Sequence, residues 1–173
     1  MQCRFCKNKL EHVFVDLINT PASNSFLTKE QLNEPEHFHP LKLFVCENCK
    51  LVQIDEYIKS DDIFNQDYAY FSSYSTSWLK HAENYVEMIV KKLSLNETSY
   101  VTEIASNDGY LLQYFQEKQI PCIGIEPTSS TASVAKQKGI EIIEDFFNTN
   151  LAKNLKKSDL ILGNNVLAHV PDI

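Results

Sequence analysis

The sequence predicts an α/β protein, in which a small metal-binding module precedes a parallel sheet with flanking helices. Two observations carry this prediction. Two Cys-x-x-Cys pairs lie within the first 50 residues, and from residue 99 onward segments of strand character alternate with segments of helical periodicity. Alternating strands and helices form parallel sheets, because each helix returns the chain to the starting edge. We therefore divide the chain into a metal module (1–60), a connector (61–98) and the first part of a sheet domain (99–173).

The composition excludes several classes of protein. Hydrophobic residues make up 43% of the chain, yet no apolar run approaches the roughly 20 residues of a membrane span. The net charge of −7 disfavours nucleic-acid partners, because phosphate contacts need clustered Lys and Arg. No apolar signal segment follows Met1, and the five cysteines are then typical of a reducing compartment. We expect a cytoplasmic protein without nucleic-acid or membrane partners.

The two cysteine pairs, Cys3 with Cys6 and Cys46 with Cys49, predict a Zn²⁺ site. Each pair presents two thiolates in a tight turn, and two turns complete a tetrahedral shell. Four thiolates leave no open position, so we expect a structural zinc in a zinc-ribbon-like module, with strands near 12–17, 41–45 and 51–54. The alternatives are four unrelated buried thiols, or a redox pair, which neither turn favours because neither opens a helix after a strand.

Two histidines between these pairs, His37 and His39, are either further metal ligands or surface side chains, and the four available thiolates favour the second interpretation.

The connector begins with a segment rich in Tyr and Ser, 61–75, which includes Tyr68 and Tyr70. These rings either line a ligand pocket, where they stack on a base or bind a sugar, or pack in the interface between two modules. Both interpretations remain open. A helix follows, with Ser75 or Thr76 as its N-cap and apolar residues at helical spacing up to residue 93.

The sheet domain is predicted from three strand-helix units in series. Gly139 lies just beyond the second helix, where a C-cap glycine is common. The expected strands are 100–105, 121–126, 140–144 and 160–166, and the expected helices are 109–118, 130–138 and 149–157.

Polar residues follow each of these strands, at the sheet edge where α/β folds bind nucleosides. The turn after the first strand has only one glycine, but its alanine and serine are small and its asparagine tolerates left-handed backbone. The acid that ends the second strand is placed to accept hydrogen bonds from ribose hydroxyls, and the third strand ends near the expected adenine edge. The predicted ligand site comprises Glu103, Ala105, Ser106, Asn107, Gly109, Glu126, Pro127, Asp145, Phe146, Asn164 and Asn165.

Five motifs together resemble the S-adenosylmethionine-dependent sugar C-methyltransferases, which methylate ring carbons of nucleotide-linked keto-deoxysugars. The resemblance extends over essentially the whole chain and implies a zinc module followed by a Rossmann-type (class I) methyltransferase domain. The motifs are the two cysteine pairs and the segments 67–75, 103–112, 124–128 and 163–172.

The resemblance also implies roles for the site residues. The turn from Ala105 to Gly109 would hold the methionine part of S-adenosylmethionine, Glu126 its ribose, and Asp145 with Phe146 its adenine. Asn164 and Asn165 would lie near the amine and the methyl group. His169 and Tyr70 would act on the substrate side, His169 as an acid, a base or an oxyanion-stabilising group, and Tyr68 would reach the same region less surely. The partner would be a nucleotide-sugar.

The resemblance also implies that the chain is an amino-terminal part of a longer enzyme, since a further Tyr/Glu/His motif and a carboxyl-terminal domain would follow residue 173. Two other functions stay open. One is a non-catalytic zinc-ribbon and α/β scaffold. The other is an NAD-dependent oxidoreductase, which the absence of a Gly-x-Gly-x-x-Gly turn disfavours.

Overall fold

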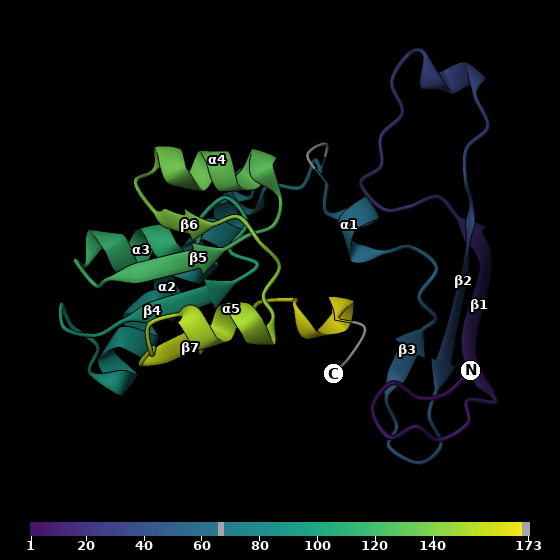
Figure 1. Cartoon of the computed structure of the whole chain (residues 1–173), viewed down its shortest axis with the longest axis horizontal. Helices are drawn as coiled ribbons and strands as arrows, with labels where there is room; N and C mark the ends of the chain where they lie inside the picture. The colour runs from purple at the N-terminus through teal and green to yellow at the C-terminus, as the bar shows by residue number, and fades with distance from the viewer. Residues whose placement is uncertain (66–67, 171–173) are drawn as a thin grey trace. The chain divides into compact units, whose positions relative to one another are not determined.

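The computed structural model describes residues 1–65 and 68–170, which form two compact units (Figure 1). The first unit comprises Met1–Ile63 with the segment that begins at Leu167, and the second is Phe64–Val166. Each unit is described by itself. Asp67, Pro171 and Asp172, which belong to two of the motifs above, lie outside the described residues. Within the described residues, no helix is long and apolar enough to cross a membrane.

The first unit is built on an antiparallel sheet of three strands in the order β1-β2-β3. The strands are β1 (His12–Thr20), β2 (His39–Val45) and β3 (Val52–Ile54), and two short helices accompany them, η1 (Gln31–Asn33) and α1 (Ser60–Ile63). All three predicted strands are present. The buried core of the unit is formed by Cys3, Leu10 and Cys46, with the other two pair cysteines packed against it. So small a core needs another source of stability, which a metal ion supplies in zinc-dependent modules.

The second unit is built on a parallel sheet of four strands in the order β6-β5-β4-β7 (Figure 1). The strand order reverses beside β4, because β5 and β6 follow on one side and β7 on the other. In open parallel sheets, ligands bind at this reversal, outside the carboxyl ends of the strands. The elements are β4 (Val101–Ile104), β5 (Cys122–Ile125), β6 (Glu141–Ile143), β7 (Leu160–Leu162), α3 (Leu112–Glu117), α4 (Ser129–Gln137) and α5 (Thr149–Asn154). This arrangement confirms the predicted α/β class.

The helix predicted in the connector, α2 (Thr76–Leu93), belongs to the core of the second unit. Ser75 is its N-cap, since the Ser75 side chain accepts a hydrogen bond from the backbone N–H of Trp78. Ala82 and Val86 are buried on the inner face of the helix and share one core with Phe115 of α3. The connector therefore completes the sheet unit, together with the short helix η2 (Ser72–Tyr74) that precedes α2.

Several elements are shorter than predicted, among them the helix expected over 149–157, which ends at Asn154, and the strand expected over 140–144, which spans Glu141–Ile143. Two of the differences have a clear physical reason. The helix expected from residue 109 begins at Leu112, because the polar turn continues through Gly109, whose φ is +72°. The strand expected over 160–166 ends at Leu162, because Gly163 and the residues after it already turn, with Asn165 at a φ of +56°.

Candidate functional site

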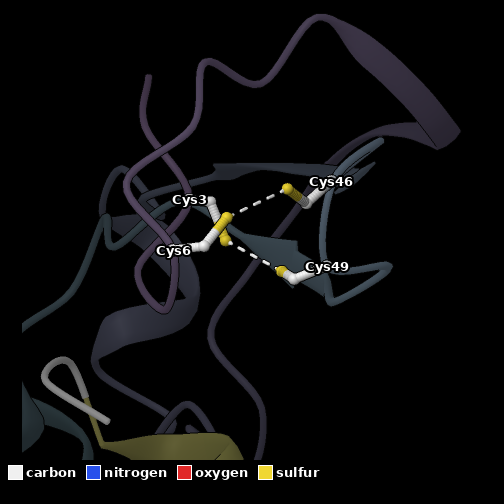
Figure 2. A group of neighbouring side chains, drawn as sticks. All are labelled: Cys3, Cys6, Cys46 and Cys49. Atoms are coloured by element: carbon white, nitrogen blue, oxygen red, sulfur yellow. Dashed lines mark hydrogen bonds between the residues drawn. The ribbon is translucent and has the colours of Figure 1, made fainter.

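The four pair cysteines converge on one point in the first unit (Figure 2). All four sulfur atoms lie within 4.8 Å of one another. The Sγ atoms of Cys3 and Cys49 are 3.6 Å apart, and those of Cys6 and Cys46 are 3.5 Å apart. Tetrahedral zinc with bonds of about 2.3 Å to sulfur separates its ligands by about 3.8 Å, so these thiols fit a Zn²⁺ ion. Within the described residues, His37 and His39 are not part of this cluster.

Each cysteine pair forms the same backbone turn. The carbonyl of Cys3 accepts a 2.9 Å hydrogen bond from the N–H of Lys7, and the carbonyl of Cys46 accepts a 2.8 Å bond from the N–H of Lys50. Both lysines have left-handed backbone, with φ of +62° at Lys7 and +66° at Lys50. The metal site is therefore assembled from two equivalent halves that lie far apart in the sequence.

Gln53 supports this centre, although the sequence analysis did not select it. The Gln53 side chain is buried, donates to Cys3 Sγ at 3.2 Å and accepts a 2.9 Å bond from the N–H of Arg4. Burial opposes ionisation of Cys3, but hydrogen bonds from the backbone of Cys6 and from Gln53 outweigh it and lower the pKa of Cys3 to about 6. The sequence does hold a signal for Gln53: it is a polar residue between the apolar residues Val52 and Ile54 of a strand, and a buried polar side chain there needs a hydrogen-bond partner.

The turn between β4 and α3 has an unusual backbone. Ala105, Asn107 and Gly109 all have positive φ, at +53°, +52° and +72°. Asparagine and glycine adopt this region readily, whereas alanine does so at a cost. The N–H of Ser106 donates to the carbonyl of Ile125 at 3.2 Å, which fixes the turn against the end of β5.

Gly124 in β5 allows this close approach. A Cβ atom at Gly124 would overlap Ser106 Oγ on one side and Ile142 Cδ1 on the other. The small residue that the sequence places before Glu126 is thus required by the packing of the turn on the sheet.

The carboxylate of Glu126 links the ends of the two central strands. Glu126 Oε2 accepts a 2.8 Å hydrogen bond from the N–H of Asn107, and Oε1 accepts a 2.9 Å bond from the N–H of Thr128. The side chain is only 4% exposed. Each carboxylate oxygen has a second lone pair, so Glu126 keeps the capacity to accept hydrogen bonds from a ligand. Pro127, the residue between Glu126 and Thr128, is half-buried.

The carboxyl end of β4 concentrates buried acids. Glu103 and Asp108 are fully buried, close to the buried Glu126. Burial, together with the charge of Glu126, raises the pKa of Glu103 well above its ordinary value. Two hydroxyls in the same region, Ser106 Oγ and Thr128 Oγ1, are buried and have no hydrogen-bond partner among the described residues. Buried polar atoms without a partner need an explanation, and an ordered water, an ion or a polar ligand can each provide one.

The outer strands contribute more exposed groups. Asp145 is exposed after β6, and its Oδ1 accepts a 2.7 Å bond from the N–H of Phe146, whose side chain is half-buried. After β7, Asn164 Nδ2 donates to the hydroxyl of Tyr110 at 2.9 Å. Tyr110 was not selected from the sequence, because it reads there as a core residue of the helix. Burial and the charge of Glu103 raise the pKa of its hydroxyl.

The connector tyrosines lie differently from one another. Tyr68 is half-buried, and its pKa is raised by burial and by the charge of Glu126. Tyr70 is 49% exposed, and its carbonyl accepts a 3.1 Å bond from Asn107 Nδ2. The connector thus contacts the turn directly.

His169 is not among the residues that the sheet edge brings together. It ends η3 (Leu167–His169), in the segment that belongs to the first unit. Its role toward a substrate stays a prediction.

Comparisons with known proteins agree with this description. Residues 3–64 match the model of the family Methyltransf_13, described as "Putative zinc binding domain". The chain is also similar to the C-methyltransferase NovU of Streptomyces niveus, at 28% identity over 176 residues. This alignment covers 99% of the chain and 42% of the relative, so the chain spans less than half of the relative's length. The chain is thus similar to a zinc-binding family in its first part and to a C-methyltransferase over nearly its whole length, which confirms the predicted resemblance at this level.

Proposed function

We propose that the second unit binds S-adenosylmethionine at the carboxyl ends of β4 and β5, as part of a C-methyltransferase that acts on a nucleotide-linked keto-deoxysugar. One observation carries the proposal. The carboxylate of Glu126 is bonded to the N–H of Asn107, so the acid after β5 and the turn after β4 form one continuous surface at the point where the strand order reverses. Ribose and amino-acid groups of a nucleoside ligand need this pairing of an acid with a polar turn.

The charge of the site favours S-adenosylmethionine over NAD. Asp108 and Glu126 are buried at this edge, and the amine of Lys138 stands 3.9 Å from one oxygen of Asp108. Glu103 lies close to them, but its raised pKa favours the neutral carboxyl, so the charge of the site comes from the other two acids. S-adenosylmethionine carries an ammonium and a sulfonium group, which buried carboxylates attract, whereas the pyrophosphate of NAD would be repelled. The relative from Streptomyces niveus is a C-methyltransferase, which agrees with this choice.

S-adenosylmethionine, when bound, supplies an electrophilic methyl group on a sulfonium sulfur. The residues of the protein then have to orient the acceptor carbon, exclude water and move a proton. A ring carbon beside a ketone becomes a nucleophile once a base removes its proton, and the resulting enolate oxygen needs a hydrogen-bond donor. Imidazole suits either role near neutral pH, which makes His169 the candidate here. The phenol of Tyr70 is the candidate for contact with the sugar or the cofactor.

The four cysteines have a separate task under this proposal. They hold one structural Zn²⁺ that stabilises the small antiparallel unit, and they leave no position for a substrate.

Calorimetric titration of the zinc-loaded chain tests the proposal. We expect S-adenosylmethionine and S-adenosylhomocysteine to bind and NAD not to bind. Glu126→Gln should weaken cofactor binding about tenfold or more, because the amide offers a donor where the ribose needs an acceptor. Glu117→Gln, at the exposed end of α3, is the matched control and should bind as the unmodified chain does.

The alternatives give different results in the same titration. A non-catalytic scaffold would bind none of the three ligands although circular dichroism shows it folded. An oxidoreductase would bind NAD. Either outcome would reject the methyltransferase proposal for this chain.

A further inference from the structure

Asn107 makes two side-chain hydrogen bonds to the connector, in addition to its place in the turn. Its Oδ1 accepts a 2.8 Å bond from the N–H of Ser72, and its Nδ2 donates a 3.1 Å bond to the carbonyl of Tyr70. One amide side chain thus satisfies both a donor and an acceptor of the segment 70–72. The two residues that it joins to the turn are 35 and 37 positions away in the sequence.

Asp108 continues the same interaction one residue further along both segments. Its Oδ2 accepts bonds from the N–H of Ser73, at 3.3 Å, and from the Ser73 hydroxyl. The carboxylate is fully buried, and Lys138 donates a 2.7 Å bond to the carbonyl of the same residue. Because a buried carboxylate is costly without partners, the two Ser73 donors compensate for the burial of Oδ2, while Oδ1 has no hydrogen-bond partner among the described residues.

The backbone of Asn107 connects these contacts to the proposed cofactor site. Its N–H donates to Glu126, the acid proposed to hold the ribose, while its side chain holds Tyr70 and Ser72. The backbone conformation alone does not require asparagine, since glycine adopts a φ of +52° at no cost. The side chain is what the contacts with the connector need.

We propose that Asn107 and Asp108 are positioning residues that clamp residues 70–73 onto the cofactor turn, and that binding of S-adenosylmethionine tightens this clamp. The inference rests on the proposed function for its second part. The clamp presents Tyr70 at the rim of the site, so the cofactor and the substrate-facing segment become one ordered surface. Ligand binding selects the ordered arrangement because Glu126 is shared between the ribose and the turn.

Amide hydrogen exchange measured by NMR on the zinc-loaded chain tests the clamp. The Ser72 and Ser73 amides report on it directly, because they donate to Asn107 and Asp108. Asn107→Gly should raise the exchange rate of the Ser72 amide about fivefold, the effect of losing one hydrogen bond. Asn107→Asp keeps an acceptor and should restore slow exchange at Ser72. A residue needed only for turn backbone would show no difference between glycine and asparagine.

A matched control is available in the other unit. Asn24 also has left-handed backbone, with a φ of +60°, so Asn24→Gly makes the same chemical change at the same conformation. It should leave the Ser72 and Ser73 amides unchanged. For the second contact, Ser73→Ala removes the hydroxyl bond to Asp108. Its control is Ser77→Ala, which removes a hydroxyl of the first turn of α2 that contacts Ser75 Oγ at 3.1 Å.

Saturating S-adenosylmethionine tests the coupling. At about 100 times the dissociation constant, linkage permits up to about a hundredfold slowing of exchange, and we expect the Ser72 and Ser73 amides to slow in the unmodified chain and much less in Asn107→Gly. Equal exchange in Asn107→Gly and Asn24→Gly would overturn the clamp. Binding without slowing would overturn the coupling. Failure of the ligand to bind at all would reject the proposed function instead, and the ligand-free comparison would still decide the clamp.

Discussion

Glu103 is a buried acid whose surroundings oppose its ionised form. It is fully buried at the end of β4, and burial together with the charge of Glu126 raises its pKa well above the ordinary value. In the folded state, the proton is therefore held more tightly than in the unfolded state. The stabilisation that this proton gives is complete below the ordinary pKa and is lost as the pH rises through the raised value.

The direction of this pKa shift predicts how the stability of the fold changes with pH. As the pH rises above the ordinary range of a carboxyl group, the melting temperature of the unmodified chain should fall relative to that of Glu103→Gln, because glutamine stays neutral throughout. Differential scanning fluorimetry at several pH values measures the difference. Glu117→Gln, at an exposed position, should follow the unmodified chain. Parallel curves for the unmodified chain and Glu103→Gln would contradict the assignment of a raised pKa.

Gly124 offers a steric prediction at the same scale. Gly124→Ala should destabilise the second unit by about 1–3 kcal/mol, the usual cost of overpacking, because the added methyl meets both Ser106 Oγ and Ile142 Cδ1. Gly163→Ala is the control, since its Cβ would stand 3.6 Å from the nearest atom, in ordinary contact with Val166. Urea unfolding measures both. If both variants were destabilised equally, the loss of stability would come from replacing glycine as such, and not from contact of the new methyl group with Ser106 and Ile142.

At the scale of elements, we expect the strands β1, β2 and β3 to depend on a metal ion at the four-cysteine cluster. Their buried core is limited to Cys3, Leu10 and Cys46, so hydrophobic burial alone stabilises them weakly. Cys46→Ser should reduce the zinc content from one ion per chain and weaken the β-sheet signal of the first unit. Cys122→Ser, which alters the one cysteine outside the cluster, should keep one zinc ion. Metal analysis with a chromogenic chelator decides this, and full zinc occupancy in Cys46→Ser would contradict a four-thiolate site.

The elements also show what the sequence could and could not predict. The strands of the parallel sheet were predictable, because their apolar runs are bounded by polar turns, and so was the Ser75 cap of α2. The ends of elements were not, since a positive φ at Gly109 or Asn165 does not by itself say where pairing stops. The contacts of Asn107 with Tyr70 and Ser72 could not be predicted from the sequence, because they join the side chain to backbone groups 35 or more residues away and produce no periodic pattern.

The same reasoning explains the outcome at the site. Glu126 and the turn were predictable because their chemistry follows the ends of neighbouring strands. Tyr110 and Gln53 were not selected, because each reads as an ordinary member of its helix or strand until its partner, Asn164 or Cys3, is brought to it. The roles assigned to His169 and Tyr70 in substrate chemistry remain predictions.

At the scale of the whole molecule, the chain holds two separate cores. One is the cysteine-centred cluster of the first unit, and the other joins α2, α3 and the sheet of the second unit. Scanning calorimetry should therefore resolve two transitions, because each unit buries a core of its own. Addition of a strong zinc chelator should abolish the first transition and leave the second in place, whereas a ligand of the second unit should shift only the second. A single transition that moves as a whole with the chelator would contradict independent units.

The two equivalent halves of the metal centre also have a consequence for biosynthesis. Cys6 and Cys46 are 40 residues apart, so the first half leaves the ribosome before its partner has been made. At a translation rate of about 5–20 residues per second, the delay is on the order of 2–8 s. During this interval the nascent chain carries two thiols with an incomplete coordination shell, open to exchange with cellular metal carriers or to oxidation. Under the proposed zinc assignment, the coordination shell becomes complete only when Cys49, the last of the four cysteines, has been synthesised.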